Sequence, residues 1–314
     1  MIRILANDGI AANGKQLLQD AGFEVVTDKI AQDDLMTELN NFDAIIVRSA
    51  TKVRKELIDA SPNLKAILRG GVGIDNIDHE YAASKGIPTY NTPAASSDAV
   101  AELVFGHFFA LSRFLHRSNR ELTAADGDFN KLKKAYAKGR QLRGRTLAVI
   151  GFGRIGMAAA RIGLGLGMKV VAVDPYKEED TVKLEFADGQ TLDFRIKTIS
   201  LEEAIKQADY ITIHVPGGNL INTDEIASMK DGVIIANTSR GGVINEDALL
   251  EGLNSGKIAG VALDVFVGEP QPRRDLLEHP RASVSPHIGA ATNEAQDNIG
   301  VELFEKIRDH FAEK

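Results

Sequence analysis

The stretch TLAVIGFGRIGMAAARIGLGLGMKVVAVD, residues 146–174, decides the fold. It predicts a buried strand, a glycine-rich turn, a helix and a second strand. Gly151, Gly153 and Gly156 have the G-x-G-x-x-G spacing of a dinucleotide-binding turn. The first glycine permits the tight turn, the second lets a pyrophosphate approach the backbone, and the third lets the helix pack closely on the strand. Because a helix amino terminus attracts anions, this stretch predicts a nucleotide site.

An acidic residue at the end of the second strand narrows the choice of nucleotide. The carboxylate of Asp174 can accept hydrogen bonds from both ribose hydroxyls of an adenosine, and its charge repels a 2′-phosphate. We therefore expect NAD rather than NADP. A glycine turn without a ligand is disfavoured, because the strand, the glycines, the helix and the acid all agree.

Strand and helix patterns alternate over the rest of the chain, which predicts an α/β protein with parallel sheets. One small sheet is expected from apolar runs at residues 2–5, 23–26, 44–47 and 66–68, with helices near 16–21, 34–40 and 55–59. A second sheet is expected from runs at residues 146–151, 169–174, 210–215, 233–237 and 259–265. The 314 residues exceed one typical domain of about 150, so we expect two domains.

Three segments lie outside these two series. Residues 96–122 carry apolar side chains at helical spacing and predict one long helix that bridges the domains. Residues 293–311 predict a helix that returns to the first domain. Within residues 181–197, TVKLEF and TLDFRIK flank an Asp-Gly turn and predict a β-hairpin. The hairpin is either a surface decoration, which is favoured, or a flap near the adenine end of a bound nucleotide.

Composition excludes several classes of function. The 37 Lys and Arg residues against 44 Asp and Glu residues give a formal net charge of −7, which disfavours nucleic acid and anionic membranes as partners. The chain has no cysteine, so disulfides, thiolate metal sites and a cysteine nucleophile are excluded, and no metal site is expected. No apolar run approaches the roughly 18 residues of a membrane span, and the start lacks a secretory signal. We expect a cytoplasmic protein.

Three loops that follow strands of the second series carry side chains suited to proton transfer. NTSRGG contains Arg240, DVFVGEP contains Asp264 and Glu269, and SPHIGA contains His287. Because the carboxyl ends of parallel strands meet at one edge of a sheet, we expect these loops to converge. A guanidinium can hold a carboxylate, an imidazole can move a proton, and a carboxylate can orient that imidazole. The alternative for each residue taken singly is an ordinary solvated side chain.

The other six of the seven histidines are expected to be structural. His214 ends an apolar run near the nucleotide turn, and there a packing role is favoured over catalysis. Surface or packing roles fit the rest, which are His79, His107, His116, His279 and His310.

Eight ordered motifs now identify a family. They are VRSAT, LRGGVGIDNID, YNTPAASSDAVAE, GFGRIG, ITIHVP, NTSRGGVINEDAL, AGVALDVFVGEP and SPHIGA. The chain resembles the D-isomer-specific 2-hydroxyacid dehydrogenases over nearly its whole length, and within them the phosphoglycerate dehydrogenase branch. The resemblance implies a catalytic set of Arg240, Glu269 and His287. It also implies two Rossmann-like or flavodoxin-like domains, with an NAD-binding domain (96–284) inserted into a discontinuous substrate domain (1–95 and 285–314), and a homodimer built on the 96–122 helix.

The resemblance also assigns the groups that contact ligands. The residues expected to bind NAD are Gly151, Gly153, Arg154, Ile155, Gly156, Asp174, Val215, Pro216, Thr238, Ser239, Arg240, Asp264, His287, Gly289 and Ala290. The residues expected on the substrate side are Arg48, Ser49, Arg69, Gly71, Val72, Asn91, Lys134, Arg240 and His287. In that branch Lys134 aligns with a cation contributed by the partner subunit. The alternative, that the basic run KLKKAYAKGR is an ordinary solvated stretch, is slightly favoured.

Charge on the substrate side decides between members of the family. A phosphorylated acid adds roughly two negative charges and requires cations beyond the arginine that holds its carboxylate. Arg48 and Arg69 end strands of the first domain and meet this requirement. We therefore expect NAD-dependent oxidation of 3-phospho-D-glycerate to 3-phosphooxypyruvate, the entry step of serine synthesis, with His287 taking the C2 hydroxyl proton. Glu269 would orient the imidazole, and Arg240 would hold the carboxylate and polarise the C2 oxygen.

Two other functions stay open. A glyoxylate or hydroxypyruvate reductase would use the same catalytic set without the phosphate arginines, and an NAD-sensing corepressor would use the fold with little turnover. The sequence also departs from the family pattern. The loop after Pro216 is shortened to GGN, and no regulatory domain is expected after Lys314.

Overall fold

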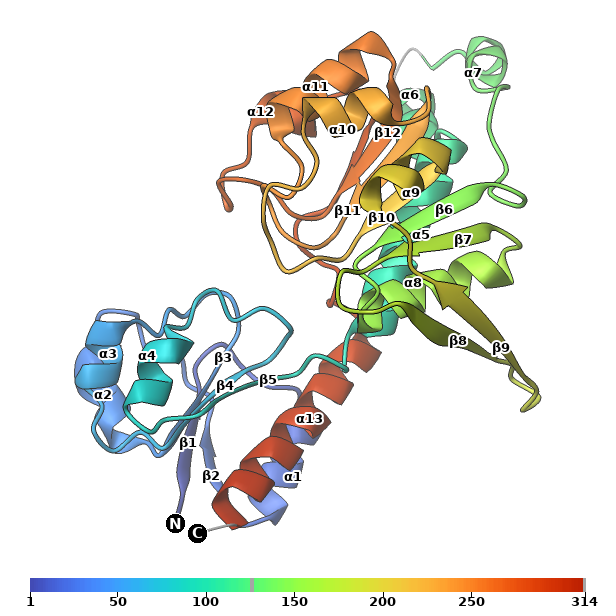
Figure 1. Ribbon diagram of the computed structural model, residues 1–314. Coiled ribbons are helices and arrows are strands. Elements are labelled where there is room, and N and C mark those ends of the chain that lie inside the picture. Colours follow the sequence, from blue (N-terminus) through green and yellow to red (C-terminus); the bar gives the residue numbers. More distant parts are fainter. Residues whose placement is uncertain (125–126, 313–314) are drawn as a thin grey trace. The chain divides into compact units, whose positions relative to one another are not determined.

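The structure of the chain, a computed structural model, describes residues 1–124 and 127–312. The chain divides into two compact units, and Met1–Ser97 with Ala290–Lys314 form unit 1 while Asp98–Gly289 form unit 2. Residues 313 and 314, which belong to the expected substrate domain, lie outside the described residues. Each unit is built on a parallel sheet with helices on both faces (Figure 1), so the predicted α/β class is confirmed.

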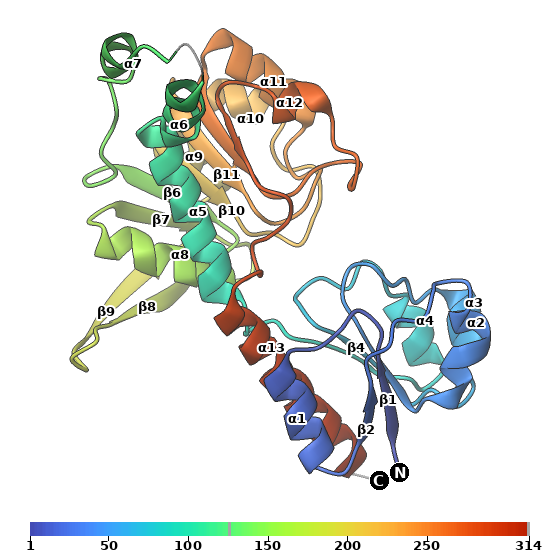
Figure 2. The same cartoon turned by 180° about the vertical axis from the view of Figure 1, so that it is seen from behind.

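Unit 1 holds a five-stranded sheet in the order β2-β1-β3-β4-β5. Helices α1 and α13 cover one face, and the shorter helices α2, α3 and α4 cover the other (Figure 2). The elements are β1 (Arg3–Ala6), α1 (Ala12–Asp20), β2 (Glu24–Val26), α2 (Leu35–Glu38), η1 (Leu39–Asn41), β3 (Ala44–Val47), α3 (Lys55–Asp59), β4 (Ala66–Arg69), α4 (His79–Ser84), β5 (Thr89–Asn91) and α13 (Asn293–Ala312). The strands and helices expected in this unit are present. β5 and α4 are additional to them.

Helix α13 joins unit 1 through a contact that only glycine allows. Gly14 of α1 faces Gly300 of α13, and a Cβ on Gly14 would lie 2.5 Å from the Gly300 Cα. The close approach brings Ile299, Leu303 and Ile307 onto the sheet, where they are buried. The two parts of unit 1, far apart in the sequence, therefore share one hydrophobic core.

Unit 2 holds a six-stranded sheet in the order β13-β12-β11-β10-β6-β7. The elements are α5 (Ser97–Ser112), α6 (Leu115–Thr123), α7 (Phe129–Ala135), β6 (Thr146–Ile150), α8 (Arg154–Gly165), β7 (Lys169–Val173), β8 (Glu179–Glu185), β9 (Thr191–Lys197), α9 (Leu201–Gln207), β10 (Tyr210–Ile213), α10 (Thr223–Ser228), β11 (Val233–Asn237), α11 (Glu246–Ser255), β12 (Ile258–Leu263), α12 (Arg274–Leu277) and β13 (Ala282–Val284). The five expected strands are present, and β13 is a sixth. The chain runs outward from β6 in both directions, which leaves a switch point between β6 and β10.

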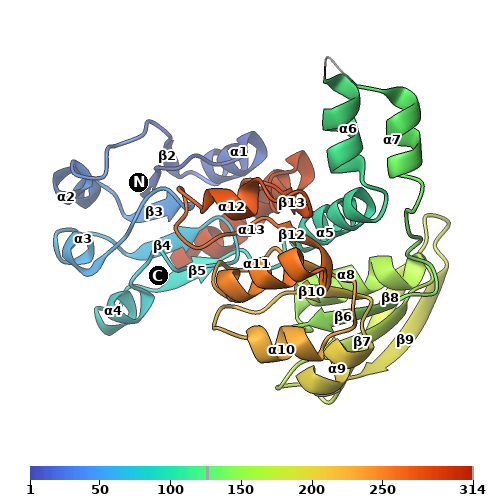
Figure 3. The ribbon, with the colours of Figure 1, turned by 90° about the horizontal axis from the view of Figure 1, so that it is seen from above.

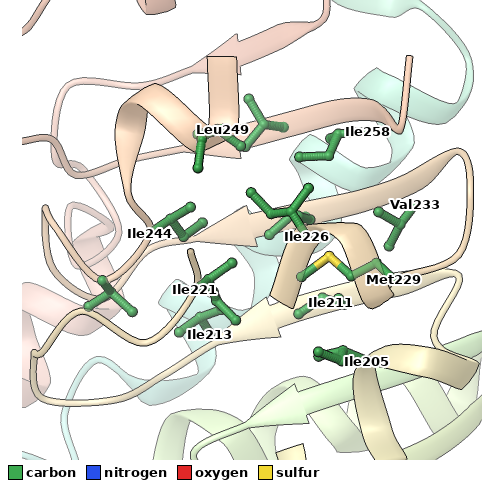
Figure 4. Close-up of a cluster of buried hydrophobic side chains, with 14 of the residues drawn as sticks. Ile205, Ile211, Ile213, Ile221, Ile226, Met229, Val233, Ile244, Leu249 and Ile258 are labelled. Atoms are coloured by element: carbon green, nitrogen blue, oxygen red, sulfur yellow. The ribbon is translucent and has the colours of Figure 1, made fainter. Parts of the chain in front are cut away.

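Both faces of this sheet are buried, as the near-continuous apolar strands predict. Helices α5 and α8 cover one face, and α9, α10 and α11 cover the other. Figure 4 shows the second interface, where side chains such as Ile211 and Ile213 of β10 meet Ile205 and Leu249 from the helices. These branched side chains interdigitate and fix the positions of the loops at the strand ends.

The single helix expected over residues 96–122 is wrong, because two helices occupy this segment. Helix α5 ends at Ser112, and α6 begins at Leu115 after Phe114, whose φ is 55°. The Phe114 ring lies 5.5 Å from the ring of Tyr136, and the Arg140 amide donates to the Ser112 carbonyl. These contacts, made by residues after α7, end the helix although the apolar spacing continues. Figure 3 shows α6 and α7 side by side.

The predicted hairpin is confirmed. Strands β8 and β9 pair in antiparallel register, and Val182 and Ile196 pack with α8 and β7 in the core of unit 2. Thr198, which follows β9, bridges to Ala172 of β7. Over the described residues, no helix is long and apolar enough to cross a membrane.

Candidate active site

The glycine-rich turn lies at the switch point of unit 2. Gly151 has a φ of 90°, and a Cβ there would lie 2.5 Å from the His214 carbonyl oxygen at the end of β10. A Cβ on Gly156 would overlap the Gly151 carbonyl oxygen, whereas a Cβ on Gly153 would meet nothing within 4 Å. Two glycines are therefore required by packing, and the third leaves an open backbone at the amino end of α8.

Asp174 is held directly over this turn. Its Oδ2 accepts a hydrogen bond from the Phe152 amide at 2.9 Å, and its Oδ1 accepts one from the Tyr176 amide at 2.9 Å. Each carboxylate oxygen has a second lone pair, so both can still accept a hydroxyl. Lys177 donates to the Phe152 carbonyl at 2.9 Å and pairs with Asp180 at 2.6 Å, which ties the start of the hairpin segment to the turn.

The loop after β11 is organised by one buried amide. Asn237 accepts hydrogen bonds from the Ser239 amide and hydroxyl, and its Nδ2 donates to the Arg240 carbonyl at 2.8 Å. Gly241 approaches the Phe266 carbonyl so closely that a Cβ would overlap it. This contact brings the loop with Arg240 against the loop with Glu269. The Arg240 guanidinium is half-buried and donates to the Ser239 carbonyl at 2.7 Å.

Glu269 and His287 form a hydrogen-bonded pair. The Nδ1 of His287 lies 2.8 Å from Oε2 of Glu269, and Oε1 of Glu269 accepts from the Phe266 amide at 2.8 Å. An ionised carboxylate can only accept, so Nδ1 is the donor and Nε2 is the nitrogen presented to a ligand. The His287 side chain is 49% exposed, which leaves the ring open on one side. The arrangement can move a proton at Nε2 while Glu269 holds the ring.

The loop that carries His287 is anchored by Asp264, which is 1% exposed. Its Oδ1 accepts from the Ser285 hydroxyl at 2.6 Å and the Ile288 amide at 2.9 Å, and its Oδ2 accepts from the Gly289 amide at 2.8 Å. His287 itself has a φ of 56°, in the left-handed region. The sequence predicts that Asp264 contacts NAD, and what the structure shows is that its carboxylate fixes the backbone around the histidine.

Sequence reasoning did not predict a role in the site for Ser285 or for His107 of α5, which contacts the Ser285 hydroxyl. His107 is buried, with Nδ1 2.8 Å from Ser283 Oγ and Nε2 3.0 Å from Ser285 Oγ. Two features of the sequence could have indicated this contact: a serine two residues before His287, and a polar side chain on the apolar face of a helix. The packing role expected for His107 understates these contacts.

Unit 1 gathers most of the substrate-side candidates at one sheet edge. Arg48, Arg69 and Asn91 follow or end the adjacent strands β3, β4 and β5. The Arg69 guanidinium lies across Gly71, where a Cβ would overlap it, and the Asn91 Nδ2 donates to the Val72 carbonyl at 2.6 Å. The Arg48 side chain passes within 3.9 Å of the Cβ position of Gly70. The two arginines therefore flank the same glycine loop.

The backbone beside Arg48 is held by side chains from two other loops. Asp8 accepts from the Arg48 amide at 2.7 Å and from the amide and hydroxyl of Thr51. Asn76 donates to the carbonyls of Arg48 and Thr51. Ser49, between them, is exposed. Arg48 and Ser49 thus sit on a loop with little freedom to rearrange.

Comparison of the chain with known proteins identifies its family. The model of the D-isomer-specific 2-hydroxyacid dehydrogenase NAD-binding domain matches residues 105–289. The chain belongs to this family. Hydroxypyruvate reductase of Thermotoga maritima is 42% identical over 97% of both chains, and D-3-phosphoglycerate dehydrogenase of Bacillus subtilis is 37% identical over 98% of this chain and 56% of its own. The solved structure of the NAD-dependent formate dehydrogenase of Staphylococcus aureus in complex with NAD is 26% identical, covers 99% of this chain and 96% of its own, and has a TM-score of 0.79.

The chain spans about half the length of the phosphoglycerate dehydrogenase and nearly all of the hydroxypyruvate reductase. Membership in the family makes it an NAD-dependent D-2-hydroxyacid dehydrogenase.

The residues of this dehydrogenase fit NAD, which is its cofactor. Gly153 leaves the backbone open at the amino end of α8, where a pyrophosphate is attracted. Each oxygen of Asp174 accepts one amide and so has a lone pair left that a hydroxyl could use, and Val215 lies beside Gly151. In the described part of the chain, the buried Thr238 hydroxyl has no hydrogen-bond partner, as expected of a group that meets a ligand.

The remaining expected residues fall in different places. Arg154 and Ile155 form the first turn of α8, and Pro216 is exposed after β10. A Cβ added to Gly289 would lie 3.2 Å from the Asp264 carboxylate. Ala290 begins the second segment of unit 1. Lys134 is exposed on α7, and the structure does not bring it to the loops that carry Arg240, Glu269 and His287.

His214 has the packing environment expected for it. Its Nε2 lies 2.9 Å from the Thr212 hydroxyl, and desolvation lowers the pKa of its imidazole to about 3. A ring that stays neutral is a poor proton carrier near neutral pH. Among the described residues, no group of three or more potential metal ligands occurs.

Proposed function

We propose that this dehydrogenase oxidises 3-phospho-D-glycerate to 3-phosphooxypyruvate and so supplies the first step of serine synthesis. The observation that supports this substrate is a pair of arginines that flank one glycine loop of unit 1. Arg48 follows β3, Arg69 ends the adjacent strand β4, and Gly71 lies against the Arg69 guanidinium. A phosphate carries about two negative charges, and arginine offers the planar set of donors that phosphates bind best.

Chemistry is assigned to three side chains of unit 2. Nε2 of His287 takes the proton of the C2 hydroxyl, and Glu269 keeps the ring in place through Nδ1. Arg240 holds the substrate carboxylate and polarises the C2 oxygen, which the guanidinium can do with two parallel donors. NAD, held by the residues at the strand ends of unit 2, would supply the hydride acceptor for C2. In the reverse direction the protonated His287 returns the proton to the C2 oxygen.

The cofactor contacts are proposed along the strand ends of unit 2. Asp174 binds the adenosine ribose, the turn from Gly151 to Gly156 binds the pyrophosphate, and Thr238 with Asp264 faces the nicotinamide end. The open backbone at Gly153 and the unpartnered Thr238 hydroxyl in the described part of the chain support this assignment. Asp174 would reject the 2′-phosphate of NADP by charge repulsion.

A hydroxypyruvate or glyoxylate reductase is the second candidate. It is favoured by the similarity to the Thermotoga maritima hydroxypyruvate reductase, which is 42% identical and matches over the full length. The same three side chains of unit 2 would perform that reaction, since it also interconverts a hydroxyl and a carbonyl beside a carboxylate. The two candidates differ only in what binds the other end of the substrate.

A substrate panel tests the assignment. Steady-state rates of NADH formation are measured with 3-phospho-D-glycerate and D-glycerate, and rates of NADH consumption with 3-phosphooxypyruvate, hydroxypyruvate and glyoxylate. The phosphorylated acid of each pair is expected to have a kcat/KM higher by at least one to two orders of magnitude, because a single charged hydrogen bond contributes roughly 1.5 to 3 kcal/mol. Equal values within each pair would transfer the assignment to the reductase.

A homodimer and a cytoplasmic location belong to the same proposal. Phe109, Leu115 and Leu122 are apolar side chains exposed along α5 and α6, in the segment expected to form the dimer. Apolar side chains gathered on one segment are typical of a surface that a second subunit covers. Light scattering of the purified protein is expected to give twice the mass of one chain.

A further inference from the structure

A buried polar chain begins on helix α5 of unit 2. His107 is 8% exposed, and both of its ring nitrogens contact serine hydroxyls of the segment around β13. Nδ1 lies 2.8 Å from Ser283 Oγ, and Nε2 lies 3.0 Å from Ser285 Oγ. An aliphatic side chain would fill this face of the helix without the cost of burying a polar ring. Packing alone therefore does not account for the histidine.

The chain continues from Ser285 to the backbone around His287. The Ser285 hydroxyl donates to Oδ1 of Asp264 at 2.6 Å, and the same carboxylate accepts the amides of Ile288 and Gly289. These two amides directly follow His287, whose φ of 56° is unfavourable for a residue with a side chain. The carboxylate thus holds the loop in a conformation that it would otherwise leave.

The directions of the hydrogen bonds are determined by Asp264. An ionised carboxylate only accepts hydrogen bonds, so the Ser285 hydroxyl donates its single proton to the bond with Asp264. Ser285 must then accept from Nε2 of His107, which makes Nε2 the protonated nitrogen and Nδ1 the acceptor for the Ser283 hydroxyl. Burial lowers the pKa of His107 below its usual value, in keeping with this neutral tautomer.

We propose that His107 is a positioning residue for the loop of residues 285–289. By donating to Ser285 it keeps the serine proton directed at Asp264, and Asp264 then holds the amides of Ile288 and Gly289. The result is a fixed placement of the His287 ring beside Glu269. The catalytic part of this inference rests on the role proposed for His287, whereas the placement of the loop does not.

Two substitutions at His107 separate this role from packing. The amide nitrogen of Gln is as many bonds from Cβ as Nε2 of histidine, so His107→Gln can reach Ser285. The amide oxygen of Asn is as many bonds from Cβ as Nδ1 and accepts as Nδ1 does, so His107→Asn reaches only Ser283. Both variants bury one primary amide on α5 and differ mainly in the hydrogen bond to Ser285, which makes each the control for the other.

Deuterium exchange of the peptide that contains Ile288 and Gly289 is the direct measurement. Exchange at these amides is expected to rise about tenfold or more in His107→Asn and to stay close to the wild type in His107→Gln. The kcat is expected to fall about tenfold in His107→Asn, since small displacements of a reacting group are costly, while the KM for NAD changes little. Ser285→Ala combined with His107→Asn should add nothing further, because the two residues act in one chain.

Ser112→Ala is the matched control for a lost buried hydrogen bond. Ser112 is also on α5 and pairs with the Tyr210 hydroxyl at 2.8 Å, away from the chain to Asp264. It is expected to lower the melting temperature without changing exchange at residues 288 and 289. Equal exchange in the Gln and Asn variants overturns the inference. Increased exchange in His107→Asn with unchanged kcat supports the positioning of the loop and overturns the claim that this positioning affects catalysis, whereas His287→Asn tests the role of His287 itself.

Discussion

The two parallel sheets share the strand order around their first strand, yet their switch points are filled differently. In unit 1, Asp8 follows β1, and its carboxylate accepts the backbone amides of Arg48 and Thr51 beyond β3. In unit 2, the turn at Gly151 follows β6 and leaves the backbone of Gly153 open. A carboxylate of the protein thus fills the switch point of one sheet, whereas the other keeps the open backbone at which we propose that a pyrophosphate binds. Strand order creates the crevice, and individual side chains decide what it binds.

The largest effect expected from this difference concerns the chemistry of unit 2. His287→Asn should lower kcat by roughly two to four orders of magnitude, because it removes the proton-accepting nitrogen. The loss should be the same for phosphorylated and unphosphorylated acids, and the dissociation constant of NAD, measured by calorimetry, should stay nearly constant. A variant with a normal kcat would exclude His287 from the mechanism.

Substitutions in unit 1 should instead discriminate between substrates. Arg48→Ala and Arg69→Ala should each lower kcat/KM for 3-phospho-D-glycerate by about one to two orders of magnitude, the equivalent of one charged hydrogen bond. The kcat/KM for D-glycerate should change little. If both substrates weaken equally, the arginines are structural and the reductase assignment takes their place. The double variant shows whether they share one phosphate, since shared contacts are not additive.

A smaller effect is expected at the ribose. Asp174→Ala should lower kcat/KM with NAD by about tenfold and leave or raise the value with NADP, because the charge that repels the 2′-phosphate is removed. The comparison requires both cofactors at several ionic strengths, since salt screens this repulsion. Equal use of NAD and NADP by the wild type would contradict the role given to this carboxylate.

The smallest effect concerns stability near neutral pH. The pKa of His214 is about 3 in the folded chain, below the ordinary value of about 6.5, so the unfolded chain binds more protons between these values. The free energy of unfolding therefore falls as the pH drops below about 7. His214 alone should account for about 0.7 kcal/mol between pH 7 and 6. Urea unfolding of the wild type and His214→Leu at both pH values measures the difference, and parallel pH dependences would contradict it.

Local patterns predicted the parts of the fold that depend on neighbours in the sequence. The strand, turn and helix around Gly151 and Gly156 follow from apolar runs and glycine spacing. The break at Phe114 could not be predicted, because its cause is the contact with Tyr136 and the hydrogen bond from Arg140. Strands β5 and β13 were not predicted because their sequences, TYN and ASV, contain no apolar run, whereas β2 is equally short but follows Phe23 and contains Val25 and Val26.

The same limit applies to the site. Arg240, Glu269 and His287 could be named because each lies in a short motif after a strand. The connection from His107 through Ser285 to Asp264 could not, because it joins three elements that are distant in the sequence. Hydrogen-bond partners of this kind become visible only when the strands β12 and β13 and helix α5 are placed together.

The two-part composition of unit 1 has a consequence for synthesis on the ribosome. Residues 1–97 emerge before the rest, but only α1 covers the sheet face that also meets Ile299, Leu303 and Ile307 until α13 has been translated. The intervening residues 98–289 form a continuous segment and can fold as they appear. The part of this apolar face that α1 leaves uncovered therefore stays exposed through most of translation, until Gly300 docks against Gly14.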